Sequence, residues 1–419
     1  MLKKLTDLKE KKQNDEIPEG YKKSEGYLIP KEWNLVQFKD LFNRLTRKNK
    51  ENNQNVLTIS ARQGLISQMD YYNTLYASEN KLGYSLLHKG DFSYNKSYSG
   101  DYAYGAIKRL EAYDKGIVSP LYICFEAKEG TNAEFYNQYF ESGMFNREIY
   151  KIAQEGARNH GLLNVSTEDF FDSFLVFPLA KEQEKIADVL IRLDKIIALK
   201  KERIIEETRL KKWLTINLFD TLQHKYPEKE ICKITDYIDY RGKTPKKATT
   251  GVFLVTAKNI KMGFIDYNVS KEYIPSEDYE FVMQRGKPQI GDVLITTEAP
   301  CGNVAQIDNE EVALAQRVIL LRAKNGICNE YLCHYLQSGV FQKQLRIFQT
   351  GLTAQGIKGE TLHKMKIPVP PLAKQVSICK VVSEQNNVIA LLEEELEHYE
   401  EMKKSLMQLL LTGIVRVNI

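Results

Sequence analysis

The chain has 419 residues, of which 43% are hydrophobic and 27% are charged, and its formal net charge is +4 at pH 7. This length and apolar content allow more than one buried core, so we expect roughly two to four folded domains. No run approaches the roughly 18 apolar residues of a membrane span and no apolar signal segment opens the chain, so we expect no membrane association and a cytoplasmic location. The small net charge requires any nucleic-acid surface to be a local patch.

Residues 1–26 are dense in Lys and Glu and predict a polar N-terminal lead-in. Residues 27–176 and 223–369 each contain short β-branched and aromatic runs broken by Gly, Asn and Asp, a pattern typical of strands and turns. The clearest of these runs are 56–59, 121–125, 253–256, 293–295 and 318–321. Each segment also contains an apolar helical run, so we expect two domains of mixed strands and helices.

The two segments are related by duplication. Leu35 matches Ile231, Asp40 matches Asp236 and Ser142 matches Ser338, each pair 196 residues apart. The loops 156–161 and 351–356 both begin and end with Gly, but the residues between the glycines differ. We therefore expect two copies of one scaffold that present different surfaces to different targets.

A second repeat occupies residues 177–222 and 370–419, and each copy begins with a Pro-Leu-Ala-Lys box, at 178–181 and 371–374. Positions spaced alternately by four and three residues are mostly apolar in the second copy, and the same register occurs 192 residues earlier. These positions are Ile378, Val382, Gln385, Ile389, Leu392, Leu396, Tyr399, Lys403, Leu406 and Leu410, and Ile186, Leu190, Leu193, Ile197, Lys200, Ile204, Glu207, Lys211, Leu214 and Leu218.

This spacing predicts two long helices, each about forty residues and, at ~1.5 Å per residue, roughly 60 Å long. A rod with one apolar stripe needs a partner, so we expect the two helices to pack antiparallel as a coiled coil that relates the halves by a pseudo-twofold axis. The charged residues between the apolar positions are expected to be solvated flanks or a docking face for another subunit. The polar interruptions Lys200, Glu207 and Lys211 are not explained by the pattern.

The box at 370–375, the related box near 178–183 and the ending at 406–417 resemble the DNA-specificity (S) subunits of type I restriction-modification systems. The stretch 240–245 with 257–261 also resembles the opening of a target-recognition domain in that family. The first box departs from the family pattern, because Phe177 stands where a second Pro is usual and one extra residue precedes Gln183.

The resemblance implies an α+β fold of two target-recognition domains, each a mixed sheet with helices, joined by the two long antiparallel helices. It implies a non-catalytic protein: each domain reads half of a bipartite sequence in double-stranded DNA, while the helices set the gap and bind two methyltransferase (M) subunits. Restriction (R) subunits would complete an ATP-driven endonuclease. S-adenosylmethionine, ATP and Mg would belong to the partner subunits, and no cofactor to this chain.

An alternative is a self-contained DNA methyltransferase or nuclease that uses such domains. The sequence has no Asn-Pro-Pro-Tyr or Asp-Pro-Pro-Tyr loop, and Tyr237 occupies the position of the first glycine that a phosphate-binding loop ending at 242–244 would need. A test for S-adenosylmethionine binding by the isolated chain would distinguish this alternative. A third alternative is a coiled-coil scaffold without a DNA role, which a failure to bind DNA even with methyltransferase partners would favour.

The six cysteines include no Cys-x-x-Cys pair, which indicates reduced thiols. Cys328, Cys333 and His334 form the closest group of soft ligands, but no second ligand pair is near them in sequence. We therefore expect ordinary helix positions here, no metal site and no catalytic residue.

Contacts with DNA require cations for phosphates and amide or guanidinium groups for base edges, presented on loops held by a scaffold. In the second half the candidates are Arg241, Lys243, Lys246, Lys247, Lys258, Asn259, Lys261, Thr353, Gln355 and Lys358. In the first half they are Arg62, Gln63, Asn95, Lys96, Tyr98, Arg158, Asn159 and His160.

Overall fold

A computed structural model describes residues 17–60, 63–74, 78, 80–97, 103–153, 163–240, 245–350 and 355–418 of the chain. The chain divides into two compact units, the first formed by residues 1–199 with 396–419 and the second by residues 200–395. Both long helices therefore contribute a segment to each unit. Among the described helices, none has the length and apolar character needed to cross a membrane.

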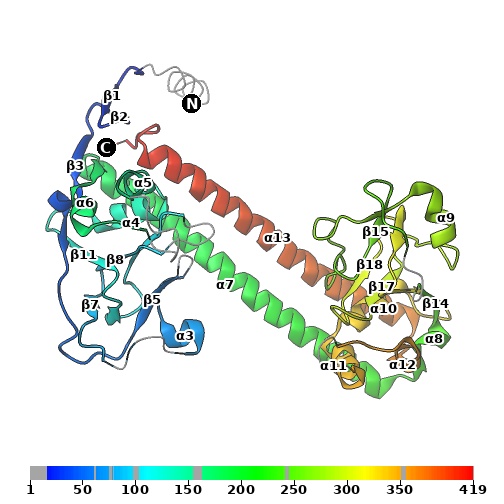
Figure 1. The fold of residues 1–419 in the computed structure, drawn as a ribbon. Helices are drawn as coiled ribbons and strands as arrows, with labels where there is room; N and C mark the ends of the chain where they lie inside the picture. Colours follow the sequence, from blue (N-terminus) through cyan, green and yellow to red (C-terminus); the bar gives the residue numbers. More distant parts are fainter. Residues whose placement is uncertain are drawn as a thin grey trace. The chain divides into compact units, whose positions relative to one another are not determined.

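In the first unit, short helices lie beside a central antiparallel sheet (Figure 1). Its strands are β1 (Tyr21–Ser24), β2 (Tyr27–Pro30), β3 (Asn34–Gln37), β4 (Phe42–Arg44), β5 (Leu57–Ser60), β6 (Gly64–Ser67), β7 (Ser85–His88), β8 (Phe92–Asn95), β9 (Ala106–Arg109), β10 (Lys115–Val118), β11 (Ile123–Ala127) and β12 (Phe174–Phe177). Its helices are α2 (Phe38–Leu41), α3 (Gln68–Tyr72), α4 (Ala133–Glu141), α5 (Asn146–Ile152), α6 (Thr167–Asp172) and the start of α7 (Ala180–Lys225).

Among the described residues, the second unit has three sheets where the first has five. Its strands are β13 (Glu228–Glu230), β14 (Thr235–Asp239), β15 (Val252–Val255), β16 (Tyr273–Ile274), β17 (Val293–Thr296), β18 (Val304–Gln306), β19 (Val312–Leu314), β20 (Val318–Ala323) and β21 (Lys366–Pro368). Its helices are α8 (Ile231–Ile234), the 3₁₀ turn η1 (Ser276–Asp278), α9 (Tyr279–Val282), α10 (Asn329–Gln337), α11 (Gly339–Phe348), α12 (Gly359–Lys364) and the start of α13 (Leu372–Leu411).

The central sheets of the two units have the same strand order, β4-β11-β8-β9 in the first and β14-β20-β17-β18 in the second, with all neighbours antiparallel. The Gly-Asp turns before β8 and β17 are also alike. The Asp91 carboxylate accepts a hydrogen bond from the His88 amide at 2.7 Å, and Asp292 accepts one from the Gln289 amide at 2.8 Å. The duplication seen in the sequence is therefore a duplication of sheet topology and of turn chemistry.

The segment from Tyr21 to Pro30 is a β-hairpin, although the sequence predicts a polar lead-in up to residue 26. Tyr21 and Tyr27 are buried, and the Tyr21 hydroxyl donates a hydrogen bond to the Gly413 carbonyl near the C-terminus at 3.0 Å. The Tyr27 hydroxyl donates one to Glu148 at 2.9 Å. Two tyrosines whose partners are distant in sequence thus hold in place a segment that its polar composition alone predicts to be exposed to solvent.

Helices α7 and α13 contact each other within each unit. In the first unit, the Lys403 ammonium binds the Asp194 carboxylate at 2.5 Å. In the second unit, Lys200 binds Glu395 at 2.6 Å and the Gln385 amide donates to Glu207 at 2.7 Å. In the second unit the contact residue rises from 200 to 207 along α7 while its partner falls from 395 to 385 along α13, so the two segments run antiparallel there.

The exposure of these helices follows the predicted seam, whose described positions are all buried or half-buried while most flanking positions are exposed. The polar interruptions find partners across it. Glu207, with its side chain 8% exposed, accepts from Gln385, and Lys200 pairs with Glu395. Burial lowers the pKa of Lys211, and the Glu393 carboxylate opposes that shift. Lys200 and Glu207 therefore each contact a side chain of the other helix.

Candidate nucleic-acid interface

The candidate interface in the second unit is built at the end of strand β17. Thr296 closes a hairpin with Asn303: the Thr296 amide donates to the Asn303 carbonyl and the Asn303 amide donates to the Thr296 hydroxyl, both at 2.9 Å. The Asn303 side-chain amide then donates to the Ile260 carbonyl at 2.8 Å. Because Thr296 is fully buried, these bonds fix the loop around residue 260 to the end of the sheet.

The next residue, Thr297, attaches two more loops. Its amide donates to the Arg317 carbonyl at 3.0 Å, and its carbonyl accepts from the Ile357 amide at 3.0 Å. Gly356 forms backbone bridges to Glu298 and Thr350, and a Cβ at Gly356 would lie 2.8 Å from the Glu298 side chain. Any larger residue at position 356 would therefore have to displace the Glu298 side chain where this loop crosses the end of β17. We call the four loops attached in this way, 256–264, 297–303, 315–318 and 355–358, the β17 loop cluster.

Asn259 holds one loop of this cluster in shape. Its side-chain oxygen accepts from the Thr256 amide at 3.0 Å and from the Thr256 hydroxyl at 2.7 Å, and its amide nitrogen donates to the Asp266 and Ser270 carbonyls, both at 2.9 Å. The residue is 0% exposed. The amide is thus fully used inside the protein, so Asn259 positions the loop and does not present its side chain to DNA as the sequence suggested.

Three lysines and one glutamine proposed from the sequence surround this framework. Lys258, Gln355 and Lys358 are exposed and Lys261 is half-buried. Lys246 and Lys247 are also exposed but lie beside strand β16, where Lys247 forms an ion pair with Glu272 at 2.7 Å. The structure therefore brings Lys258, Lys261, Gln355 and Lys358 together around one strand end.

Two further residues of the cluster were not identified from the sequence. Arg317 is 53% exposed in its side chain and lies 3.4 Å from the Glu298 carboxylate. Phe264 is 58% exposed at the tip of the turn that the Lys261 amide closes onto the Phe264 carbonyl. An exposed aromatic ring beside cations can stack on bases or wedge between base pairs. Single exposed residues of these types give no periodic signal, which is why sequence patterns did not reveal them.

The first unit has an equivalent arrangement at the end of β8. The Leu163 amide donates to the Lys96 carbonyl at 3.0 Å, as the Ile357 amide does to Thr297. The side chain of Asn95 accepts from the Ser97 amide at 3.0 Å. The Lys96 ammonium donates to the Val165 carbonyl at 2.6 Å, and burial lowers the pKa of this lysine. In this structure Lys96 is thus partly engaged within the protein.

Gln63 is exposed in the turn between β5 and β6, where its amide donates to the Ser60 hydroxyl at 3.2 Å. The remaining candidates lie outside the described residues. They are Arg62, Tyr98, Arg158, Asn159, His160, Arg241, Lys243 and Thr353.

Comparisons with known proteins agree with the resemblance expected from the sequence. Residues 225–401 match the family model described as "Type I restriction modification DNA specificity domain". The type I restriction enzyme MjaVIII specificity subunit of Methanocaldococcus jannaschii is 26% identical over 327 residues, covering 72% of this chain and 75% of that protein. The putative MjaX specificity subunit of the same organism is 24% identical and covers 95% of this chain and 97% of that protein.

The fold comparison agrees with these matches. The crystal structure of a type I restriction-modification system S subunit from M. genitalium aligns with a TM-score of 0.52 at 15% sequence identity. The alignment covers 90% of this chain and 96% of that chain, so the likeness in fold extends over both units.

Proposed function

We propose that this chain, a DNA-specificity subunit of the type I restriction-modification family, reads a bipartite site in double-stranded DNA, with one recognition domain for each half. As a specificity subunit it supplies sequence recognition rather than catalysis. We propose domain limits of 27–176 and 223–369 for the two readers, and 177–222 and 370–419 for the helices between them.

The observation that carries the proposal is a repeated framework with unlike residues at the same place. Both units have the same strand order in the central sheet. In both, the residue after β8 or β17 accepts a backbone hydrogen bond from a later loop. At this strand end the first unit has Asn95 and Lys96, whereas the second has Thr296 and Thr297. Loops held by a common scaffold but differing in side chains are suited to reading different base sequences.

In the second domain we propose that the β17 loop cluster contacts DNA through Lys258, Lys261, Arg317 and Lys358. The cations would bind phosphates, while Gln355 and Arg317 have the groups that read base edges. Arg241, Lys243, Lys246, Lys247 and Thr353 remain proposed contacts. In the first domain the proposed contacts are Arg62, Gln63, Asn95, Lys96, Tyr98, Arg158, Asn159 and His160.

We further propose that α7 and α13 form an antiparallel coiled coil that sets the gap between the half-sites and docks two M subunits, with R subunits joining the full complex. The contacts Glu207–Gln385 and Asp194–Lys403 between the helices support this proposal, and both residues of the first pair are seam positions. Polar pairs within an apolar seam specify one register of a helix pair, as a gap of constant length requires. The pseudo-twofold relation of the halves and a cytoplasmic location remain predictions.

The proposal is tested by mapping methylated adenines in a genome that carries this gene together with its methyltransferase gene. We expect one bipartite sequence with a gap of constant length. A single uninterrupted motif, or methylation that persists unchanged when this gene is deleted, would contradict the proposal.

A further inference from the structure

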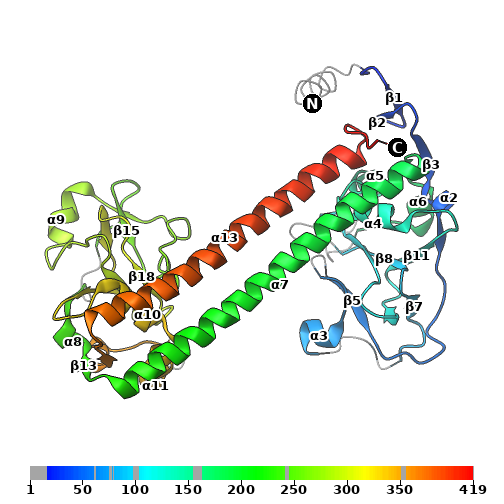
Figure 2. The same ribbon diagram turned by 180° about the vertical axis from the view of Figure 1, so that it is seen from behind.

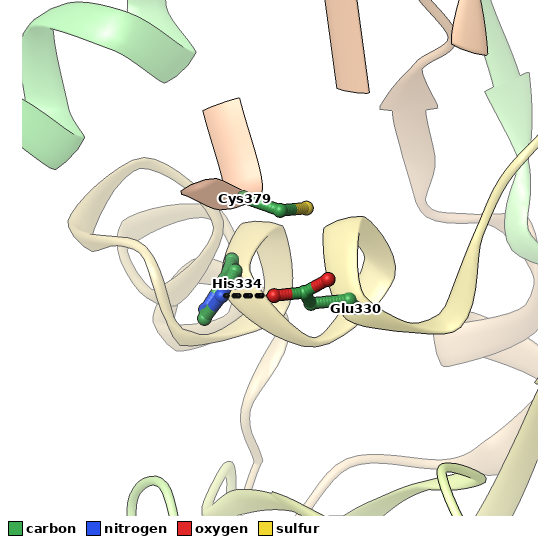
Figure 3. A group of neighbouring side chains, drawn as sticks. All are labelled: Glu330, His334 and Cys379. Atoms are coloured by element: carbon green, nitrogen blue, oxygen red, sulfur yellow. Dashed lines mark ion pairs between the residues drawn. The ribbon is translucent and has the colours of Figure 1, made fainter. Parts of the chain in front are cut away.

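Helices α10 and α13 meet in the second unit at a group of metal-ligand side chains (Figures 2 and 3). Glu330 and His334 lie one turn apart on α10, and Cys379 faces them from α13. One potential ligand atom from each of the three side chains lies within 4.8 Å of those of the other two. Ligand atoms around a tetrahedral zinc ion are separated by roughly 3.5 Å, so small side-chain rotations would bring these three into range.

A second thiol lies beside this group. The thiol of Cys328, the residue that precedes α10, lies close to the Cys379 thiol. This contact lowers the pKa of Cys328 and raises that of Cys379. Cys328 is also fixed in place through its backbone, because its amide donates to the Gln375 side chain at 2.9 Å. The Cys328 thiol therefore lies beside Cys379, next to the group that Glu330, His334 and Cys379 form.

The imidazole is suited to bind a metal. Burial disfavours the charged form of the ring and lowers the pKa of His334, and metals bind the neutral form. Its Nε2 atom lies 3.8 Å from Glu330 and 3.2 Å from the Ser383 hydroxyl, which itself donates to Glu330 at 2.9 Å. Its Nδ1 atom is buried without a hydrogen bond of ordinary geometry to any described residue, although the Gln337 side chain is adjacent. The ring can thus release Nε2 from Ser383 and carry its proton on Nδ1.

We propose that Cys328, Cys379, His334 and Glu330 form a binding site for a divalent cation that prefers sulfur and nitrogen ligands, and that this cation is Zn²⁺. Thiolate and imidazole ligands favour zinc over magnesium or calcium. Binding replaces the thiol protons, which pass to solvent, and Glu330, with its side chain 51% exposed, provides the route by which the ion enters.

The site would join the recognition domain to the helical spacer by bonds that pass through the metal. Three of its ligands belong to the segment 328–334 and the fourth belongs to α13. A cation held there would fix α10 against α13 and thereby fix the recognition domain to the helix that carries it.

The test uses the reduced full-length protein after treatment with a chelator. Zn²⁺ is titrated in competition with a chromophoric chelator, and Co²⁺ is used as a spectroscopic probe. We expect one equivalent of Zn²⁺ to bind and to raise the melting temperature, and the Co²⁺ form to show thiolate-to-metal charge transfer. Cys379→Ser and Glu330→Gln should each weaken binding at least tenfold, while Cys232→Ser, at an exposed cysteine, should leave it unchanged.

The Ser383→Ala variant distinguishes a metal site from a group of side chains joined only by hydrogen bonds. The substitution removes the bridge between His334 and Glu330 but no proposed ligand, so Zn²⁺ affinity should be retained. Because Glu330 is exposed, Glu330→Gln should fold like the parent, so a loss of Zn²⁺ binding in this variant is not explained by misfolding. The proposal would be overturned if Zn²⁺ does not bind in a stoichiometric amount, or if the ligand variants bind it as tightly as the parent. It would also be overturned if the reduced, chelated protein binds no Zn²⁺ and forms a Cys328–Cys379 disulfide in air.

Discussion

The pair formed by Glu207 and Gln385 offers a direct test of how the two long helices recognise each other. The Glu207 carboxylate accepts from the Gln385 amide at 2.7 Å and from Arg203 of its own helix at 2.5 Å. Gln385→Leu leaves the buried carboxylate with Arg203 alone. A hydrogen bond to a charged group contributes about 1.5–3 kcal/mol, and the added apolar burial offsets about 1 kcal/mol, so we expect a net loss of about 1–2 kcal/mol.

For a unit of this size such a loss lowers the melting temperature by roughly 2–8 °C. Replacing both partners in Glu207→Leu/Gln385→Leu removes the stranded charge and completes the apolar seam, so the double variant should melt at or above the parent temperature. The exposed Asn387→Leu on the same helix is the control and should change melting little. If Gln385→Leu melts with the parent, or if the double variant melts lower than the single one, the pair does not lie in a buried seam.

Three further predictions concern the second recognition domain. Asn259→Ala should lower the free energy of unfolding of this domain by about 2–4 kcal/mol in chemical denaturation, because two carbonyls and the Thr256 amide lose their partners. The control, Lys258→Ala at the neighbouring exposed position, should change it by less than about 0.5 kcal/mol. Arg317→Ala should weaken DNA binding by the assembled complex about tenfold and reduce its salt dependence in fluorescence anisotropy, whereas Lys324→Ala, paired with Asp236, should not. Because burial lowers the pKa of His334 below its unfolded value, chelated protein should lose stability as the pH falls below about 6.5, and His334→Leu should reduce that loss in pH-dependent thermal melts; an identical pH profile would exclude this contribution.

Features that repeat along the chain were accessible from the sequence. The alternating spacing of Ile186, Leu190 and Leu193 predicts a helix seam, and all three are buried. Framework matches such as Ser142 and Ser338 predict a duplicated scaffold, and each serine hydroxyl donates to a carbonyl three residues earlier at 2.6 Å. Such signals are readable because helix and strand periods are set by backbone geometry.

Features that depend on contacts between distant segments were not accessible. Asn259 lies in a Lys-Asn-Ile-Lys stretch that suggested a DNA-contacting loop, and only the positions of the Asp266 and Ser270 carbonyls show that it is a buried clamp. Cys328 and Cys379 stand 51 residues apart in sequence and meet only because α10 packs against α13. In each case the deciding partner is fixed by tertiary packing, which leaves no local pattern.

The division of DNA reading between the two domains is tested most directly by exchanging one of them. Residues 223–369 would be replaced by the corresponding segment of another specificity subunit, and methylated adenines would be mapped in cells that carry the chimera with the same methyltransferase. We predict that one half of the bipartite site changes while the other half and the gap length stay as in the parent. A change in both halves, or no change in either, would contradict the assignment of one half-site to each domain.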